Sequence, residues 1–291
     1  MSCLASCQLD SLAGSLSSTM EPRCQKRLRY LGSALCNSAA AAAPPAPVAS
    51  PPPPGEGFGT IDLRGRVALV TGGGQGLGAT IVLALARAGA DVAVHYNSSA
   101  DKAEAGVAAA RALGQRASAF QADVGSSEEC EALASHVTDT FGHVDILVSN
   151  AGMGQGNGIA RTSDEEWERT MNVNARATLV LTRCLLPQMM CRRFGRIITV
   201  SSNVGVYGRG GASGIAYAAS KAALIALTKG IAHEGSPYIT CNCVAPGPTD
   251  TRLPTERAPG EVIVEAGSTP NALGYVALAG CRSCRVFCRG D

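Results

Sequence analysis

Short apolar runs alternate with longer amphipathic stretches through the middle of the chain. Residues 66–70 read Arg-Val-Ala-Leu-Val, and a run of this kind is typical of a strand buried on both faces of a sheet. The next stretch has apolar side chains at Leu77, Ile81 and Leu85, a spacing that predicts one face of a helix. This alternation repeats along the chain, so the sequence predicts a fold that contains both strands and helices.

The pattern predicts six strands and the helices that connect them. Strands are expected at residues 66–70, 91–96, 116–121, 144–148, 196–201 and 238–244. Helices are expected at residues 77–89, 100–113 and 126–141, from 163 toward 190, and around Tyr217 and Lys221 to about residue 233. Strands joined by helices need right-handed crossovers, which give a parallel sheet. The fold class is therefore α/β, with a single doubly wound Rossmann domain over residues 61–252.

The N-terminal segment, residues 1–60, has a different composition. It is rich in Ser, Ala and Pro, has few acidic residues and contains the proline tract 51–54, so it cannot bury a core. We interpret it as an organelle transit peptide followed by a Pro-rich disordered linker. The Ser richness and the Ala/Pro spacer favour a plastid (chloroplast) over a mitochondrion. A disordered tail without a targeting role, in a cytoplasmic protein, is the alternative.

Composition narrows the classes of function. The net charge is +2 for 291 residues, which gives no reason to expect a nucleic-acid partner. No apolar run approaches the roughly 20 residues that span a bilayer, so no membrane association is expected. Twelve cysteines are scattered along the chain. Cys281, Cys284 and Cys288 resemble half of a zinc site but lack a second pair of ligands, so no metal is expected.

A glycine-rich turn follows the first predicted strand and opens a predicted helix. Residues 71–78 read Thr-Gly-Gly-Gly-Gln-Gly-Leu-Gly, and the series Gly74, Gly76, Ala79 fits the pattern G-x-G-x-x-G/A. Glycine lets the backbone approach a pyrophosphate closely, and the helix N-terminus then stabilises its negative charge. Glycines in a loop also occur in ordinary turns, but the strand-turn-helix context indicates a dinucleotide site.

The end of the second predicted strand bears on which dinucleotide binds. An acid there reads the ribose 2′-hydroxyl of NAD, but this strand is followed by Asn97, Ser98 and Ser99, with Lys102 nearby. These groups would not repel a 2′-phosphate, and they favour NADP(H) over NAD(H). An arginine within the glycine turn is missing, and Gln75 occupies that place.

A second group of residues indicates proton transfer. Tyr217 and Lys221 are four residues apart, and Ser202 lies fifteen residues before the tyrosine. Positions i and i+4 share one helix face, where an ammonium group favours a neighbouring phenolate. The tyrosine could then exchange a proton with a substrate oxygen and the serine could hydrogen-bond that oxygen. A Tyr-x-x-x-Lys pair also arises by chance on amphipathic helices.

Together these residues resemble the short-chain dehydrogenase/reductase family over roughly residues 63–252. The resemblance adds Asp123 and Val124, the segment Ser149-Asn150-Ala151-Gly152, Asn174, and Pro246, Gly247 and Thr249. It implies that Asn174, Ser202, Tyr217 and Lys221 are catalytic. The cofactor-binding set is then Thr71, Gly72, Gly74, Gln75, Gly76, Leu77, Gly78, Asn97, Ser98, Asp123, Val124, Asn150, Ala151, Gly152, Tyr217, Lys221, Pro246, Gly247 and Thr249.

The resemblance also implies a mechanism. A nicotinamide gives hydride to a carbonyl carbon, Tyr217 protonates the oxygen, Ser202 orients it, Lys221 bonds the nicotinamide ribose, and Asn174 holds a water in a proton relay. Within the family the sequence is most similar to 3-oxoacyl-acyl-carrier-protein reductases, which act on carrier-bound acyl groups in fatty acid synthesis and use NADPH. Reductases of sugars, steroids and other ketones share these motifs, so a different small-molecule substrate is the second hypothesis.

The C-terminal segment, residues 253–291, departs from the family pattern. The family continues into a substrate-covering helix, another helix and a last strand, whereas this segment shows only a candidate strand at residues 261–264. We therefore expect the last strand to be missing and the sheet edge to be open. The family forms homo-oligomers, partly through this segment. A third hypothesis follows, that the chain is a non-catalytic truncated isoform that binds nucleotide or a full-length partner.

Overall fold

The computed structural model describes residues 61–154, 156–208, 214–247 and 275–279. The predicted transit peptide and linker, the candidate strand at 261–264, the cysteines at 281, 284 and 288 and the predicted cofactor residue Thr249 lie outside the described residues. The predictions about these segments therefore stay predictions.

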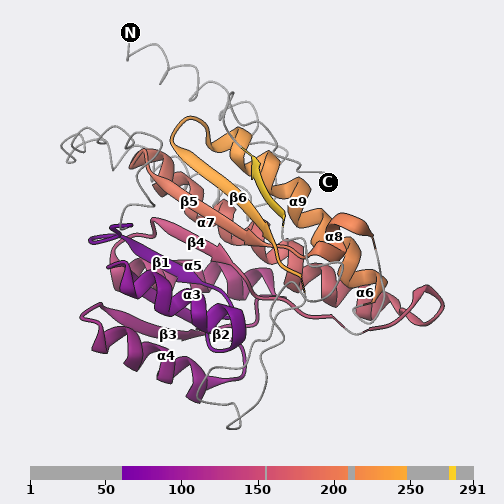
Figure 1. Cartoon of the computed structure of the whole chain (residues 1–291), viewed down its shortest axis with the longest axis horizontal. Coiled ribbons are helices and arrows are strands. Elements are labelled where there is room, and N and C mark those ends of the chain that lie inside the picture. The colour runs from indigo at the N-terminus through magenta and orange to yellow at the C-terminus, as the bar shows by residue number, and fades with distance from the viewer. Residues whose placement is uncertain (1–60, 155, 209–213, 248–274, 280–291) are drawn as a thin grey trace, which may run out of the picture. The chain divides into compact units, whose positions relative to one another are not determined.

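Six parallel strands form the sheet in the order β3-β2-β1-β4-β5-β6 (Figure 1). Their bounds are β1 Val67–Val70, β2 Asp91–Tyr96, β3 Ala117–Gln121, β4 Ile146–Ser149, β5 Gly195–Val200 and β6 Ile239–Ala245. Each agrees with a predicted strand to within two residues. The strand order reverses between β1 and β4, and in a doubly wound sheet a ligand crevice opens at the carboxyl ends of the strands at that point. The predicted α/β Rossmann fold is confirmed.

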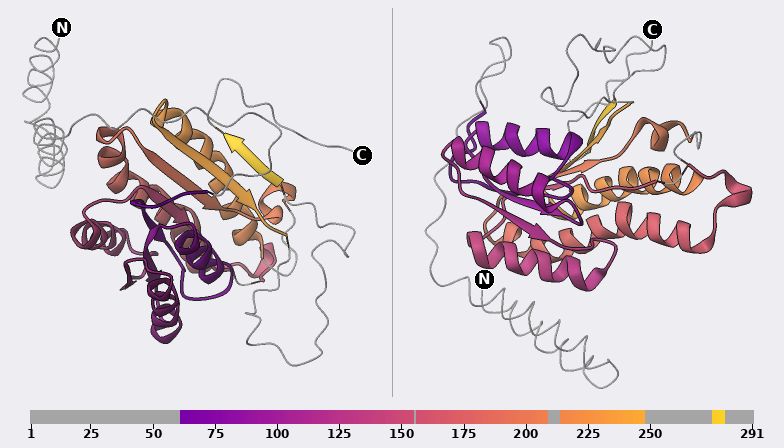
Figure 2. Two further views of the ribbon diagram at one scale, coloured as in Figure 1. Left: turned by 60° about the vertical axis from the view of Figure 1, so that its left-hand side comes forward. Right: turned by 90° about the horizontal axis from the view of Figure 1, so that it is seen from below.

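The expected open edge beside β6 is wrong. A seventh strand, β7 (Tyr275–Ala279), runs antiparallel to β6, with Cys243 opposite Ala277, and it appears in yellow beside β6 in Figure 2. The segment Tyr-Val-Ala-Leu-Ala is apolar and suits a strand. No helix pattern precedes it, so the alternation that revealed the parallel strands gave no signal for it. Its pairing satisfies backbone groups of β6 that an open edge would expose.

Helices cover both faces of the sheet (Figure 2). On one face lie α3 (Gly76–Arg87) and α4 (Ala100–Ala112), and on the other lie α5 (Ser127–Phe141), α7 (Ala177–Cys191) and α9 (Ile215–Gly235). Ser126 caps α5, because its hydroxyl accepts from the Glu129 amide at 3.2 Å. By length and mean hydropathy α9 could span a bilayer. It packs on β5 and β6, however, and 44% of its apolar stretch is buried inside the protein, as in a core helix.

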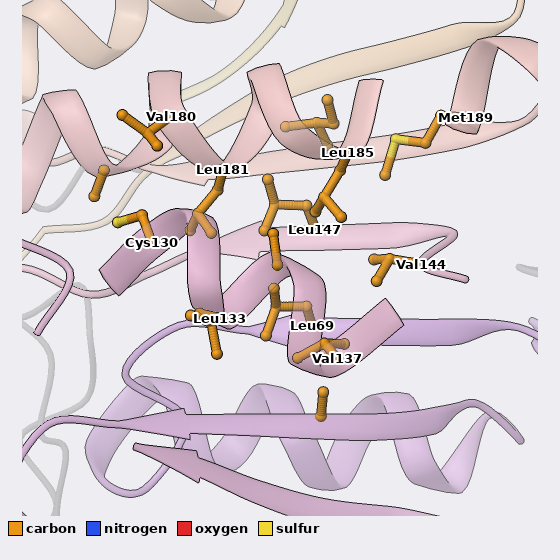
Figure 3. Close-up of a cluster of buried hydrophobic side chains, with 14 of the residues drawn as sticks. Leu69, Cys130, Leu133, Val137, Val144, Leu147, Val180, Leu181, Leu185 and Met189 are labelled. Atoms are coloured by element: carbon orange, nitrogen blue, oxygen red, sulfur yellow. The ribbon is translucent and has the colours of Figure 1, made fainter. Parts of the chain in front are cut away.

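The core has one apolar layer on each side of the sheet. Figure 3 shows the first, in which side chains of α5 and α7 close over Leu69 of β1 and Leu147 of β4. The second lies beneath α3 and α4. In α3 the buried positions are Gly78, Ala79, Val82 and Ala86, whereas the predicted face of Leu77, Ile81 and Leu85 is only partly buried. The small side chains at the buried positions let α3 lie close to the sheet. The larger apolar residues that predicted the helix therefore lie beside the buried face and not at its centre.

The long helix predicted from residue 163 toward 190 is interrupted. It consists of α6 (Asp164–Met171), a π-helical turn at Asn172–Arg176, and α7. Ser163 caps α6 by accepting from the Glu166 amide, but the Glu166 carboxylate accepts from Asn157 instead of completing a capping box. The wider π turn buries Asn174, which is 1% exposed. Such turns often occur at functional sites. Two short helices, η1 (Ile159–Arg161) and α8 (Asn203–Tyr207), complete the described elements.

Candidate functional site

The glycine turn is hydrogen-bonded to the segment that follows β4. Asn150, just after β4, donates from Nδ2 to the carbonyl oxygens of Thr71 (2.9 Å) and Gly72 (3.2 Å). The Thr71 hydroxyl accepts in return from the Asn150 and Ala151 amides. Gly72 has φ = +62°, a conformation that favours glycine. These bonds fix the turn at the point where the crevice opens.

Close packing explains the last glycine of the turn, Gly78. A Cβ on Gly78 would collide with the Gly72 carbonyl oxygen and lie 2.7 Å from Asn150 Nδ2. The N-cap residue of α3, Gln75, makes no side-chain capping bond. The first amides of α3 are therefore available to an anion, as a pyrophosphate site requires.

A cleft of about 840 Å³ runs along the carboxyl ends of β1, β2 and β4. Most of the predicted cofactor residues line it: Gly72, Gly74, Gln75, Gly76, Leu77, Gly78, Asn97, Ser98, Asp123, Val124, Asn150, Ala151 and Gly152. Thr71 does not line the cleft but supports the turn from behind. A smaller pocket of about 310 Å³ shares Leu77, Asn150, Gly152 and Met153 with the cleft, so the two adjoin.

The smaller pocket contains the predicted proton-transfer group. Ser202 at the start of α8, and Tyr217 and Lys221 on α9, line it together with Pro246 and Gly247. The Lys221 ammonium lies 5.6 Å from the centre of the Tyr217 ring. The Ser202 hydroxyl accepts from the Val204 amide at 3.3 Å and donates to Asn203 Oδ1 at 3.3 Å. The predicted i, i+4 pair and the serine therefore meet at one pocket.

Lys221 is a buried cation. Its side chain is 3% exposed, and Nζ donates to the Val200 carbonyl oxygen at 2.7 Å. Burial penalises the ammonium form and lowers the pKa of Lys221 to about 8, while Cys243 acts electrostatically in the opposite direction. The Ser201 hydroxyl donates to the Lys221 carbonyl oxygen at 2.6 Å and so attaches β5 to α9. The position of the amine is therefore fixed by both strand and helix.

Asn174 lies behind the pocket rather than on its wall. Its amide nitrogen donates to the Met153 carbonyl and to Ser220 Oγ, and its oxygen accepts from the Met153 amide, all at 2.8 Å. A Cβ on Gly152 would lie 3.2 Å from Lys221 Nζ and 3.4 Å from Asn174 Oδ1. These two polar atoms therefore approach the same point beside Gly152.

Two residues of the cleft escaped the sequence analysis. Arg169 of α6 donates to both carboxylate oxygens of Asp123, at 2.8 and 2.9 Å, and holds the pKa of that carboxyl below its usual range. His95 of β2 bonds the glycine turn with its imidazole. The two residues of the Arg169 pair are 46 positions apart, so no local spacing could reveal it. A polar residue at the carboxyl end of a buried strand was the available signal for His95.

The comparisons with known proteins show the family. A protein-family model described as short chain dehydrogenase matches residues 66–261, which is more than half of the chain. The chain belongs to the short-chain dehydrogenase family. The chain is 41% identical over 181 residues to 3-oxoacyl-(acyl-carrier-protein) reductase FabG of Staphylococcus epidermidis, covering 62% of this chain and 73% of that protein. It is 40% identical over 193 residues to 2,3-dihydro-2,3-dihydroxybenzoate dehydrogenase of Bacillus subtilis, covering 66% and 72%.

Solved structures of the family superpose on the chain. A short-chain dehydrogenase from Burkholderia cenocepacia in complex with NADP has a TM-score of 0.60 and 41% identity, covering 65% of this chain and 76% of that one. An NAD+-bound xylitol dehydrogenase has a TM-score of 0.60 and 30% identity, covering 64% and 71%. The chain is thus an oxidoreductase of a family that binds nicotinamide cofactors. One of these structures holds NADP and the other NAD+. The preference of this chain must therefore be inferred from the residues of its own cleft.

Proposed function

We propose that the protein reduces a carbonyl to an alcohol with NADPH, and that the substrate is a 3-oxoacyl thioester. The observation that carries the proposal is the pocket shared by Ser202, Tyr217 and Lys221, which adjoins a glycine-lined cleft suited to a dinucleotide. A nicotinamide bound in the cleft supplies the hydride. The residues of this chain then supply the proton and the hydrogen bonds to the substrate oxygen.

The proposed proton donor is Tyr217. Its hydroxyl gives a proton to the carbonyl oxygen as the carbonyl carbon accepts hydride, and the Ser202 hydroxyl hydrogen-bonds the same oxygen as charge develops on it. Lys221 has two N–H groups left after its bond to Val200, and these suit the ribose hydroxyls of the nucleotide. A water beside Gly152 would bond both Lys221 and Asn174 and would return a proton to this group.

The proposed cofactor preference rests on charge in the cleft. Its charged lining residues are Lys102, Asp123 and Arg169, and the last two neutralise each other. Lys102 therefore leaves one positive charge at the mouth, where its Nζ lies 3.4 Å from Gln75 Oε1. Asn97 and Ser98 line the same cleft, and among the described residues that line it the one carboxylate is that of Asp123, which is paired with Arg169. These groups suit the 2′-phosphate of NADP(H), and Lys102 takes the place of the arginine that the glycine turn lacks.

A second candidate is an oxidoreductase of another small alcohol or ketone. The 2,3-dihydro-2,3-dihydroxybenzoate dehydrogenase is 40% identical to this chain and the oxoacyl reductase 41%, so identity alone favours neither substrate. The same catalytic group would serve either reaction.

The test is an assay of the full-length protein with NADPH and acetoacetyl thioester, following nicotinamide absorbance, beside a panel of cyclic and sugar ketones. Oxidation of NADPH by the thioester, and its loss in Tyr217→Phe, is the expected result. Turnover of another panel member alone would support the second candidate. Binding of NADPH without any turnover would support the non-catalytic hypothesis.

The plastid location is proposed on the composition of residues 1–60 alone. The test fuses these residues to a fluorescent protein in plant cells and looks for fluorescence in plastids. Mitochondrial or cytoplasmic fluorescence would contradict the proposal.

A further inference from the structure

His95 is a buried titratable residue for which the proposed reaction has no use. It lies near the end of β2, lines the dinucleotide cleft and is 2% exposed. Its neighbours on the strand, Val94 and Tyr96, pack with the core on the α3 side of the sheet. A buried polar side chain must find hydrogen-bond partners or destabilise the fold, so its contacts indicate what it does.

The imidazole of His95 joins two segments that form the walls of the cleft. Nδ1 lies 3.0 Å from the Gly72 amide nitrogen, and Nε2 lies 3.0 Å from the Ala122 carbonyl oxygen. The backbone carbonyl of His95 also accepts from the Gly73 amide at 2.8 Å. His95 therefore holds two consecutive amides of the glycine turn and connects them to the segment that carries Asp123.

These contacts determine the protonation state. An amide N–H can only donate, so Nδ1 of His95 must accept from Gly72 and carry no proton. A carbonyl can only accept, so Nε2 must carry the proton. The geometry therefore requires the neutral Nε2–H tautomer. Protonation of Nδ1 would set two donors against each other and leave the Gly72 amide without its partner.

The surroundings of His95 favour the neutral ring. Burial lowers the pKa of His95, and the Ala122 hydrogen bond and the Asp123 charge oppose this to a smaller extent. Asp123 itself is paired with Arg169, and Glu129 accepts from the Asp123 amide. The thiol of Cys130 in α5, which donates to the Val124 carbonyl oxygen at 3.3 Å, has its pKa raised to about 12 by burial and stays uncharged. The glycine turn contributes no titratable side chain.

We propose that His95 is a positioning residue of the dinucleotide site, whose neutral imidazole holds the Gly72 amide and so keeps the glycine turn in its binding conformation. Gly72 is held on both sides, through its amide by His95 and through its carbonyl by Asn150. Since Gly78 packs against that carbonyl, a shift of Gly72 would displace the first turn of α3. Cofactor binding then requires unprotonated His95 and weakens in acid. The inference rests on the proposed use of the cleft for NADP(H).

The sharpest test compares NADP+ binding by the wild-type protein and His95→Asn between pH 5 and 8, by calorimetry. Asparagine offers an acceptor and a donor but does not titrate. The 2′-phosphate of the ligand titrates in both proteins, so only the difference between the curves reports on His95. We expect His95→Asn to bind within about threefold of wild type at pH 8, and the wild type to lose about tenfold more affinity than the variant by pH 5. Identical pH profiles would overturn the proposal.

A second measurement needs neither a variant nor a bound ligand. Nitrogen-15 NMR of the wild-type protein should show His95 as the Nε2–H tautomer at pH 7, and the Gly72 amide shift should titrate with the same midpoint as the ring. The Nδ1–H tautomer, or a Gly72 amide that ignores that titration, would contradict the inference. If the protein binds no NADP+ at all, the proposed function fails, and this measurement still tests the role of His95.

Discussion

In the glycine turn the Gly72 amide donates to His95 and the Gly72 carbonyl accepts from Asn150, whereas the Tyr217 hydroxyl has no hydrogen-bond partner within the described part of the chain. The Ser202 hydroxyl has two bonds, both at 3.3 Å. The cofactor region is therefore preorganised by bonds within the protein. In the proposed catalytic region the Tyr217 hydroxyl is available for a substrate oxygen, and Ser202 would exchange its long bond to Asn203 for one to that oxygen, where hydrogen bonds accelerate a reaction.

The strongest test of this contrast is Tyr217→Phe. Removal of the hydroxyl should lower kcat for ketone reduction about 1,000-fold, because proton transfer by a side chain contributes roughly 10²–10⁴-fold. The NADPH dissociation constant should change less than about twofold, because the bonds that hold the glycine turn come from His95 and Asn150 and stay in place. Steady-state kinetics and fluorescence titration measure the two quantities. A variant that lost cofactor binding together with turnover would show that the two regions are not separable.

Ser202, Tyr217 and Lys221, which the sequence singled out, line one pocket, and the signals that singled them out are local or belong to the family. Tyr217 and Lys221 are one helical turn apart, and the glycine turn sits between a strand and a helix that the apolar pattern identifies. The supporting contacts could not be predicted in this way. The bond from His95 to Gly72 spans 23 residues and the pair of Arg169 with Asp123 spans 46, so they arise only from the tertiary fold.

The same distinction explains the errors in the fold. A parallel strand is connected by a crossover helix, and the apolar period of that helix helps to predict the strand. β7 pairs with the edge of β6 as an antiparallel strand, and no helix pattern in the sequence precedes it. The π turn at Asn174 was also missed, because its residues suit an ordinary helix and a single π turn within a helix is rare. The sequence therefore predicted the repeating architecture but not its local departures.

The buried charge of Lys221 predicts a change of stability with pH. The pKa is about 8 in the folded protein and near 10.5 in the unfolded chain, so the unfolded state holds more protons between these values and stability rises with pH there. Below pH 8 both states are protonated, and the penalty of the buried ammonium is fully present. The rise should total about 3 kcal/mol.

Lys221→Met should remove this rise. Other groups titrate in the same range, so the quantity to measure is the difference in unfolding free energy between the two proteins from pH 7 to 10.5, by urea denaturation at each pH. The wild type should gain on the variant as pH rises. Parallel curves would mean that the ammonium of Lys221 is not desolvated in the folded protein.

Gly78→Ala tests the preorganised turn directly. The added Cβ collides with the Gly72 carbonyl oxygen, so either the turn or α3 must shift, and NADPH affinity should fall about 30-fold because small displacements in a fixed site are costly. Gly230→Ala is the matched control, since Gly230 is an exposed position in α9 with nothing within 4 Å of the new Cβ. It should bind NADPH as wild type does and unfold with about 0.5–1 kcal/mol more stability. Wild-type affinity in Gly78→Ala would show that the turn does not hold the pyrophosphate.

Lys102→Ala should have the smallest effect. It separates two roles of the cofactor region, recognition of the 2′-phosphate and support of the glycine turn. If Lys102 reads the 2′-phosphate, the dissociation constant should rise about tenfold for NADPH, equal to about 1.4 kcal/mol, and should not change for NADH. The loss should shrink at high salt because the charge is exposed. Lys229→Ala, an exposed lysine of α9, controls for the change in net charge. An equal loss for both cofactors would instead mean that Lys102 acts through its bond to Gln75, as one more internal support of the glycine turn.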